Sequence, residues 1–225
     1  MLSDKYRPTC WAEFVGQPVV SEIGLACEEP DLFAYGGERW LFESDGVAGC
    51  GKTSAAYVTA DVLGIARFNV EKIDSRATSI AELREIADQM LYHGWGPSGR
   101  RAYIIDEIQH LNPACLRFLL GWLESLPRHV IVIGTTTSIT WADDVDGLYS
   151  RWRRFRFRKP SASAVAEHLE RIARAEGMPI PPGFRFLSYL QGKADVPLAG
   201  NNVRDAIDQL RGVLNRKADG AKAVA

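Results

Sequence analysis

Short apolar runs alternate with longer amphipathic stretches over the first two thirds of the chain. Four of these runs, each bounded by charged or turn-forming residues, predict buried strands at residues 40–43, 68–73, 102–105 and 129–134. In the other stretches, apolar residues recur every three or four positions, which predicts helices at residues 19–26, 54–63, 80–90 and 116–123. This alternation indicates an α/β fold in which a parallel sheet carries helices on both faces.

The last third of the chain begins with a fifth predicted strand and continues with helices alone. Phe155 and Phe157 are two residues apart and therefore share one face of that strand. Pro160 and the serines after it indicate a hinge, beyond which helices are expected at residues 165–173, 184–190 and 203–214. We expect a five-stranded core over residues 1–159, a three-helix lid domain over 160–216 and a disordered tail over 217–225.

The first 20 residues favour an extended, anchored segment over a helix. The Arg7-Pro8 step disfavours helical backbone at the residue before the proline, and Gly16 lies a few positions further on. This segment leads into the first predicted helix at residue 19.

The stretch after the first predicted strand has the spacing G-x-x-x-x-G-K-[ST] of a phosphate-binding P-loop. Its glycines permit a tight turn, so that successive N–H groups can point at phosphate oxygens, and the helix that follows favours anions at its N-terminus. The strand before the motif and the helix after it argue against the alternative, a glycine-rich surface turn. The predicted phosphate-binding residues are Gly46, Val47, Ala48, Gly49, Cys50, Gly51, Lys52, Thr53 and Ser54.

Polar residues around this loop supply the chemistry of a nucleoside triphosphatase. Lys52 can reach the β- and γ-phosphates, and the hydroxyl of Thr53 can bind Mg²⁺. Asp106 and Glu107 follow directly after a buried strand. Asp106 would hold Mg²⁺, directly or through water, and Glu107 would polarise the attacking water. The alternative is an acidic strand end that only caps the next helix.

Three further stretches allow more than one interpretation. Residues 135–137 are threonines at the end of a strand, where a hydroxyl can orient the attacking water or serve only as part of the strand. The basic and aromatic stretch 150–159 fits a solvated edge strand, an arginine supplied to a neighbour's nucleotide, or a surface for nucleic acid. Arg204 follows the favourable N-cap Asn202, and from near the helix start its guanidinium can reach phosphate.

Composition limits which partners and which cellular compartment we expect for this protein. Charged residues make up 24% of the 225 residues and apolar residues 46%, and the net charge of −1 restricts any nucleic-acid contact to a local basic patch. The chain starts without an apolar signal segment and has no run of membrane-spanning length, so we expect no membrane association. Its four cysteines are scattered, which argues against a zinc site or disulfide framework and favours a reduced, cytoplasmic protein.

Together these motifs resemble the clamp-loader branch of the AAA+ ATPases, which includes the gamma/tau subunit of bacterial DNA polymerase III and the small subunits of replication factor C. The resemblance runs from about Lys5 to about Gly212 and covers nearly the whole chain. The stretches that carry it are Lys5-Tyr6-Arg7-Pro8, Val15-Gly16-Gln17, Ile104-Ile105-Asp106-Glu107 with Leu111, residues 119–136, Ser150-Arg151 and Val203-Arg204-Asp205-Ala206.

The resemblance implies roles that spacing alone leaves open, with ATP and Mg²⁺ as cofactors. Thr136 is the best match to the family's sensor that orients the attacking water, and Arg204 matches the lid arginine that touches the γ-phosphate. Arg151 matches the arginine finger that enters the ATP site of the adjacent subunit. The residues that match the family's adenine-side signature are Tyr6, Arg7, Pro8, Val15 and Gly16.

The resemblance also implies partners: a sliding clamp, primer-template DNA and other clamp-loader subunits in a ring. Arg76 and Arg84 fall in the segment that tracks the DNA backbone in the family. The chain departs from the family in having Trp152 in place of a cysteine, no cysteine zinc module, and a longer loop at residues 192–202. The sequence ends after the lid, without the helical collar that holds such rings together, so we expect a ring to depend on partner chains.

The sequence therefore predicts an ATP-hydrolysing clamp-loader subunit that loads a sliding clamp onto primed DNA during replication. Two alternatives stay open. One is another AAA+ ATPase that remodels DNA, such as a branch-migration motor or a helicase loader. The other is an ATP-sensing adaptor that completes a partner's ring. The presence of Glu107 and Arg151 argues against an adaptor, whereas the missing collar favours dependence on a partner.

Overall fold

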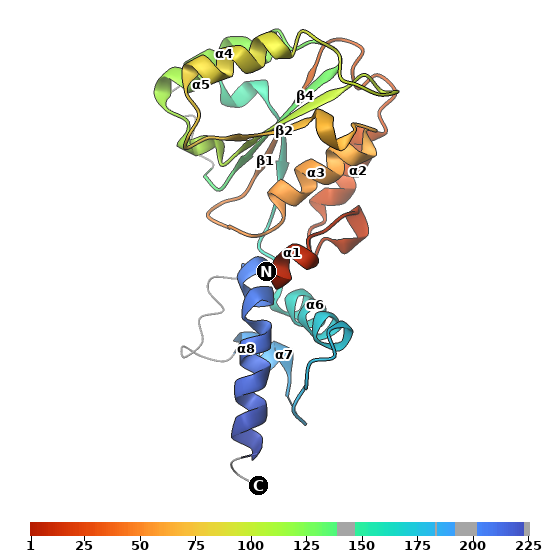
Figure 1. Ribbon diagram of the computed structural model, residues 1–225, viewed down its shortest axis with the longest axis vertical. Helices are drawn as coiled ribbons and strands as arrows, with labels where there is room; N and C mark the ends of the chain where they lie inside the picture. Colours follow the sequence, from red (N-terminus) through yellow and green to blue (C-terminus); the bar gives the residue numbers. More distant parts are fainter. Residues whose placement is uncertain (139–146, 183, 192–201, 223–225) are drawn as a thin grey trace.

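Five parallel strands in the order β2-β3-β4-β1-β5 form the central sheet of the computed structural model (Figure 1), which confirms the predicted sheet. The structure describes residues 1–138, 147–182, 184–191 and 202–222. In chain order the strands are β1 (Glu38–Glu43), β2 (Val70–Asp74), β3 (Arg101–Asp106), β4 (Val130–Thr136) and β5 (Arg153–Arg156).

The composition of the central strands explains their place in the sheet. Every residue of β4 is buried, and so are four consecutive residues of β3. Continuous burial, rather than alternation, is expected of parallel strands that helices cover on both faces. Because all five strands run the same way, their carboxyl ends lie along one edge, where β1 leads into the P-loop and β3 leads into Glu107.

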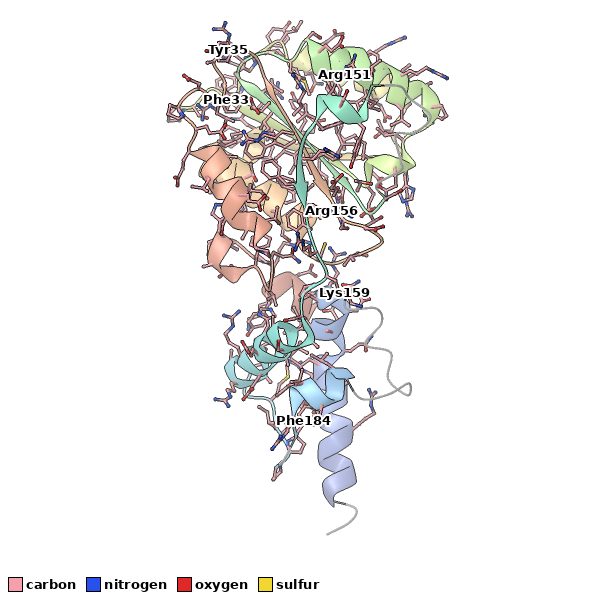
Figure 2. All side chains as sticks on the ribbon, turned by 180° about the vertical axis from the view of Figure 1, so that it is seen from behind. Phe33, Tyr35, Arg151, Arg156, Lys159 and Phe184 are labelled. Atoms are coloured by element: carbon pink, nitrogen blue, oxygen red, sulfur yellow. The ribbon has the colours of Figure 1, made fainter. Side chains whose placement is uncertain are left out.

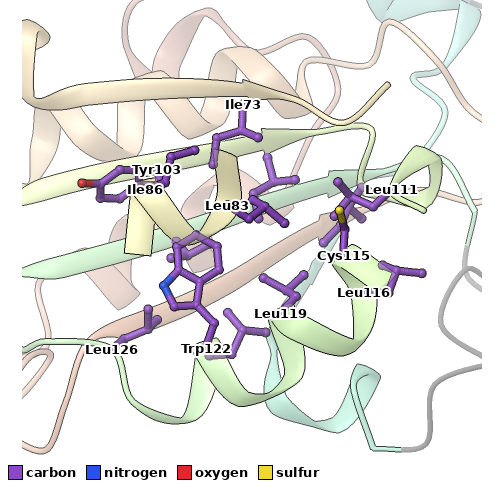
Figure 3. Close-up of a cluster of buried hydrophobic side chains, with 14 of the residues drawn as sticks. Ile73, Leu83, Ile86, Tyr103, Leu111, Cys115, Leu116, Leu119, Trp122 and Leu126 are labelled. Atoms are coloured by element: carbon purple, nitrogen blue, oxygen red, sulfur yellow. The ribbon is translucent and has the colours of Figure 1, made fainter. Parts of the chain in front are cut away.

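Two pairs of helices cover the faces of the sheet. One face packs against α2 (Val19–Cys27) and α3 (Lys52–Val62), and the other packs against α4 (Ile80–Gln89) and α5 (Pro113–Glu124) (Figure 1). Leu83 of α4 and Leu119 of α5 are fully buried and point into one apolar cluster beside Trp122 (Figure 3). The periodicity read from the sequence therefore identified the inward faces of these helices.

Local chemistry fixes where the helices begin. The Ser79 hydroxyl accepts from the Glu82 N–H, while the Glu82 carboxylate accepts from the Ser79 N–H, which forms a capping box at the start of α4. At the start of α5, the Asn112 side chain accepts from the Cys115 N–H, and Pro113 occupies the first helical position. Short 3₁₀ turns complete the core: η1 (Trp11–Glu13), η2 (Arg67–Asn69), η3 (Ile108–His110) and η4 (Tyr149–Arg151).

A third apolar cluster is built by helices that stand apart from the sheet (Figure 1). They are α6 (Ala162–Ala175), α7 (Phe186–Gln191) and α8 (Val203–Lys222), and we call them the lid helices. The N-terminal helix α1 (Leu2–Lys5) packs against α8, and Ser3 donates to the Asp208 carboxylate from both its N–H and its hydroxyl. The start of the chain is therefore attached to the lid helices as well as to the core.

Two sequence predictions about the chain ends were wrong. The first residues are not wholly extended, because Leu2–Lys5 form one helical turn that ends before the Arg7-Pro8 step restricts the backbone. The expected disordered tail from residue 217 is also wrong as far as residue 222, because α8 continues to Lys222. Four of the six residues in this stretch are alanine or lysine, which are strong helix formers, and a helix already begun continues through Asp219 and Gly220.

Candidate nucleotide-binding site

The P-loop joins the end of β1 to the start of α3 in the arrangement that the motif predicts. Gly46, Gly49 and Gly51 all have positive φ, at 67°, 65° and 100°, which other residues rarely adopt. Gly51 is also the N-cap of α3, so the loop ends at the N-terminus of an 11-residue helix. An anion placed in this turn would meet backbone N–H groups and the positive end of the helix dipole.

The loop also touches the lid helices. A Cβ added to Gly49 would lie 1.7 Å from Oδ1 of Asn202, the residue that precedes α8. That oxygen already accepts from the N–H groups of Arg204 and Asp205. Glycine is therefore needed at residue 49 to admit the lid as well as to turn the chain. The sequence contains no sign of this contact, because the two residues are 153 positions apart (202 − 49).

Lys52 is 5% exposed, and its ammonium group lies inside the loop. It donates to the Ser44 hydroxyl at 2.8 Å and to the Val47 carbonyl at 2.9 Å. Both partners are uncharged, and no described carboxylate neutralises the lysine. A buried ammonium held by neutral acceptors suits a phosphate anion, because an added negative charge would compensate it. Ser44 was not among the predicted site residues.

Asp106 is the meeting point of four elements. Its Oδ1 accepts from the hydroxyls of Thr53 and Thr135, each at 2.8 Å, and its Oδ2 accepts from the Lys72 ammonium at 2.7 Å. Burial alone would raise the pKa of Asp106, but the hydrogen bonds from Lys72, Thr53 and Thr135 hold it below its usual value. The carboxylate therefore stays ionised at neutral pH.

The Thr53–Asp106 pair fits a magnesium site. A hydroxyl and a carboxylate are hard oxygen ligands, which Mg²⁺ prefers, and P-loop proteins commonly hold the ion with these two residue types. Lys72 places a positive charge on the same carboxylate, and spacing along the chain could not have identified it. It lies on β2, and the β2–β3 pairing brings that strand alongside the end of β3.

Hydrogen bonds to Gln109, two residues further along the chain, and to threonines at the end of β4 hold Glu107 in place. It is the only described residue other than glycine with a positive φ, at 54°. Its Oε2 accepts from the Gln109 side-chain amide and, at 3.2 Å, from the Thr137 hydroxyl. Its N–H donates to the Thr135 hydroxyl at 3.0 Å. The unusual backbone angle turns the carboxylate toward the end of β4.

The structure does not bring Thr136 to this group. Its hydroxyl donates to the Ser138 carbonyl at 2.9 Å and accepts from the Ser138 N–H, whereas Thr135 and Thr137 face the two carboxylates. Alternate residues of a strand point to opposite sides, so the neighbours of Thr136 share the side that carries Asp106. The expectation that Thr136 contacts the attacking water has no support in this geometry.

A recess opens between the P-loop, the N-terminal segment and the lid helices. It brings together many of the residues predicted to bind nucleotide, namely Tyr6, Arg7, Pro8, Val15, Gly49, Cys50, Gly51, Ser54 and Arg204. The further lining residues, which were not predicted to bind nucleotide, are Ser3, Asp4, Glu13, Phe14, His168, Val203 and Ile207. Gly16 is placed differently, because it packs on Pro160 and Ala164 outside this recess. Of the predicted phosphate-binding residues, Gly46, Val47, Ala48, Lys52 and Thr53 also lie outside its lining.

Arg151 lies just before β5 and therefore where the strands begin, at the end of the sheet opposite to the P-loop. It is remote from the lid helices (Figure 2). Its carbonyl accepts from Arg39 near the start of β1, whereas the P-loop follows the end of that six-residue strand. At about 3.3 Å per residue this separates Arg151 from its own P-loop by roughly 20 Å. The guanidinium is bound to the Glu124 carboxylate through Nε at 2.8 Å and Nη2 at 2.5 Å.

The other basic residues predicted as contacts are either exposed or paired within the chain. Arg76 and Arg84 are both exposed, and Nη2 of Arg76 lies 3.1 Å from Nε2 of His110. In the stretch 150–159, Arg153 forms two hydrogen bonds with Glu29, and Arg154 lies over the Tyr149 ring. Pairing of this kind reduces the charge available for a nucleic-acid surface on that stretch.

Comparison with known protein families agrees with a nucleotide-binding site at this place in the fold. The model of the AAA family, ATPases associated with various cellular activities, matches residues 45–161, which include the P-loop, Asp106, Glu107 and Arg151. The chain belongs to the AAA family of ATPases. Its membership establishes a nucleotide-binding ATPase core, in agreement with the sheet and the P-loop described above.

Curated relatives extend the similarity beyond this core. The chain is 25% identical to DNA polymerase III subunit gamma/tau of Mycoplasma pneumoniae over 236 positions, which cover 96% of the chain and 32% of the relative. It is 26% identical to gamma/tau of Mycobacterium bovis, over 97% of the chain and 39% of the relative. Subunit tau of Bacillus subtilis is 25% identical over 95% of the chain. The chain thus spans 32–39% of the length of these relatives.

Solved structures share the fold. The Thermotoga maritima RuvB Holliday junction branch migration motor superposes with a TM-score of 0.70 at 19% identity, over 95% of this chain and 67% of that one. A structure of a point mutant of the same RuvB gives a TM-score of 0.72. At this identity the likeness concerns the fold alone. Within the described part of the chain, no helix is long and apolar enough to cross a membrane.

Proposed function

We propose that the chain is a cytoplasmic clamp-loader-type subunit, which uses ATP and Mg²⁺ to help place a sliding clamp on primed DNA. The observation that carries the proposal is the extent of the similarity to gamma/tau subunits, which covers 95–97% of the chain in the relatives named above. It passes through the AAA core and continues into the lid helices, beyond the 45–161 segment of the family model.

In this proposal Lys52 and the P-loop amides hold the triphosphate, and Thr53 and Asp106 hold Mg²⁺. Glu107 polarises the attacking water, and Thr137 and Gln109, which bind its carboxylate, position it. Arg204, on the lid side of the recess, reaches toward the γ-phosphate. The direct contact between Thr53 and Asp106 supports the assignment, because residues from α3 and β3 meet at the end of the P-loop.

Arg151 would serve the ATP site of a neighbouring subunit. It lies at the sheet edge opposite its own P-loop, so it cannot contribute to its own site. Three of its five N–H groups are bound by Glu124 and the Gly147 carbonyl, which leaves two without a partner in the described part of the chain. Two free donors suit a phosphate on another molecule. Hydrolysis should therefore depend on assembly with other subunits.

An exposed apolar surface supports a protein partner such as a clamp. Phe68, Leu91, Tyr92 and Trp95 are 72%, 69%, 71% and 81% exposed, and we call them the aromatic edge. They precede β2 and β3, so they lie at the sheet edge opposite the P-loop. Asn69 ties the two loops together through both the N–H and the carbonyl of Trp95. A cluster of large apolar side chains in water is typical of a docking surface.

Contacts with the primer-template DNA stay a prediction for Arg76 and Arg84. Both side chains are exposed and lie on the segment between β2 and the end of α4, so both can approach a phosphate backbone. Contacts of this kind would be salt-dependent and would not read sequence.

The test is the ATPase rate with primed DNA and a candidate sliding clamp, each added singly and together, in the presence of gamma/tau-type partner subunits. If the chain is a clamp-loader subunit, the ATPase rate should be highest only when primed DNA and the clamp are both present. Strand displacement or branch migration without a clamp would instead identify a DNA motor. An unchanged rate under every condition, with ATP binding retained, would identify an ATP-sensing adaptor.

The aromatic edge gives a second readout that does not depend on hydrolysis. Replacing Tyr92 and Trp95 together by serine should weaken clamp binding at least tenfold, while ATP affinity is unchanged. Leu25→Ser on α2 is the matched control, because Leu25 is 68% exposed but lies outside the aromatic edge. Equal clamp binding by the double variant and the control would remove the aromatic edge from the proposal.

A further inference from the structure

The lid helix α6 carries a buried histidine into the wall of the nucleotide recess. His168 is 8% exposed and lines the recess together with Gly49 and Gly51 of the P-loop. No phosphate-binding or hydrolytic role accounts for it. Its neighbours in the fold come from α6 and from the N-terminal segment, where Glu13 and Phe14 line the same recess.

The position of the P-loop determines which part of a nucleotide can meet His168. Phosphates belong at the amides of Gly49–Lys52, so the base must occupy the remainder of the recess. That remainder lies between the N-terminal segment and the lid, and its apolar lining residues are Pro8, Phe14, Val15, Val203 and Ile207. These apolar side chains can pack against a nucleobase, and polar groups among the lining residues must then fix its orientation.

The hydrogen-bond partner of His168 fixes its tautomer. Nη2 of Arg171, one turn further along α6, lies 2.8 Å from Nδ1 of His168. A guanidinium has N–H donors and no acceptor, so Nδ1 must accept and the ring hydrogen must lie on Nε2. A doubly protonated ring is incompatible with this contact, because Nδ1 would then also be a donor.

The charge of the ring follows from the same surroundings. Burial, together with the positive charge of Arg171, lowers the pKa of His168 to about 4, and the opposing effect of Glu13 is smaller. The ring is therefore neutral from pH 5 upwards. Nε2–H has no hydrogen-bond partner in the described part of the chain, and it is not among the buried polar atoms sealed from solvent. His168 thus offers a neutral N–H donor where its side chain lines both the recess and a second hollow beside Arg171.

We propose that Nε2–H of His168 donates a hydrogen bond to a ring nitrogen of the adenine of bound ATP, and so reads the base from the lid side. Adenine offers N1, N3 and N7 as acceptors at its edges. A base bound in this way would connect the lid helix α6 to the core through the nucleotide. The proposal rests on ATP binding by the AAA core and is independent of clamp loading.

The test compares ATP with inorganic triphosphate as ligands of the isolated full-length chain, measured by calorimetry. His168→Phe keeps a planar ring in the site and removes the donor. We expect it to weaken ATP binding about 5–10-fold, the effect of one lost hydrogen bond, while triphosphate binding is unchanged. His93→Phe is the matched control, because His93 is exposed and stacks on His129 outside the recess.

Deaza analogues identify the acceptor and separate base reading from packing. Of 1-deaza-, 3-deaza- and 7-deaza-ATP, the one that lacks the contacted nitrogen should bind the wild type as weakly as ATP binds His168→Phe. The affinity for that analogue should be the same in His168→Phe as in the wild type. The affinities for the other two analogues should fall in the variant by about 5–10-fold, as the affinity for ATP does. The proposal is overturned if His168→Phe binds ATP as the wild type does, if triphosphate binding falls equally, or if all three analogues lose the same factor.

Discussion

The Thr137 hydroxyl donates to the Glu107 carboxylate, with 3.2 Å between Oγ1 and Oε2. Its neighbour Thr136 faces away from that carboxylate and binds Ser138 instead. The group that positions Glu107 is therefore one residue further along the chain than the family pattern implies. Because the strand ends at Thr136, Thr137 belongs to the loop that leaves the sheet above the two carboxylates.

This geometry predicts opposite results for two adjacent variants. Thr137→Val removes a hydrogen bond to an ionised group and should lower ATP turnover roughly tenfold, with ATP affinity unchanged. Thr136→Val is the matched control and should leave turnover within about twofold, although the loss of a buried hydrogen bond should cost about 1 kcal/mol of stability. Steady-state ATPase assays decide between them. A larger loss of turnover in Thr136→Val would restore Thr136 as the sensor.

Lys52 provides a test of phosphate binding. Lys52→Ala removes the ammonium from the centre of the loop and should weaken ATP binding by about 10–100-fold, since a hydrogen bond to a charged group contributes about 1.5–3 kcal/mol. Lys159→Ala, at an exposed lysine beside the lid, controls for the loss of one positive charge (Figure 2). Calorimetric titration with ATP measures both. Unchanged affinity in Lys52→Ala would contradict the assignment of the loop.

The position of Arg151 predicts that ATP turnover depends on assembly with partner subunits. Arg151→Ala should leave ATP affinity of the isolated chain unchanged and should reduce hydrolysis in the assembled complex by about 10³-fold or more. The measurement is the ATPase rate before and after addition of partner subunits. If the isolated wild-type chain already shows full turnover, or if the variant retains it after assembly, Arg151 does not act on a neighbour's nucleotide.

His168 predicts a pH dependence of stability. Its pKa falls from 6.5 to about 4 in the folded chain, so between these values the unfolded chain binds a proton that the folded chain does not. The free energy of unfolding should therefore decrease as the pH falls from about 6.5 to about 4, by at most about 3 kcal/mol. Urea unfolding of the wild type and of His168→Phe gives this contribution as a difference. Parallel pH profiles would show that the ring is not held neutral.

The sequence predicted those features of the site that are encoded in consecutive residues. The P-loop, the Asp106-Glu107 pair and the apolar faces of α4 and α5 all lie in short stretches whose spacing has a direct geometric meaning. A P-loop requires a strand before it and a helix after it, and β1 and α3 occupy those places. Local chemistry was therefore sufficient for the core of the site.

The residues that the sequence missed reach the site from elsewhere in the chain. Lys72 approaches Asp106 only because β2 and β3 are neighbours in the sheet, and strand order is not visible in linear spacing. Asn202 approaches Gly49, and His168 lines the recess, only because the lid helices fold back onto the P-loop. Gln109 lies close in sequence, but its contact with the Glu107 carboxylate accompanies the unusual φ of Glu107, which no motif indicates.

The central claim, that this site binds ATP and hydrolyses it with Glu107, is tested most directly by Glu107→Gln. The variant should bind ATP with wild-type affinity, because the hydrogen bonds of Glu107 go to Thr135, Gln109 and Thr137 and not to the P-loop. In the assembled complex, its single-turnover hydrolysis rate should fall by about 10²–10⁴-fold, the usual contribution of a general base. Recovery of intact ATP from the variant complex is the predicted result. Hydrolysis of the bound ATP at the wild-type rate would contradict the account.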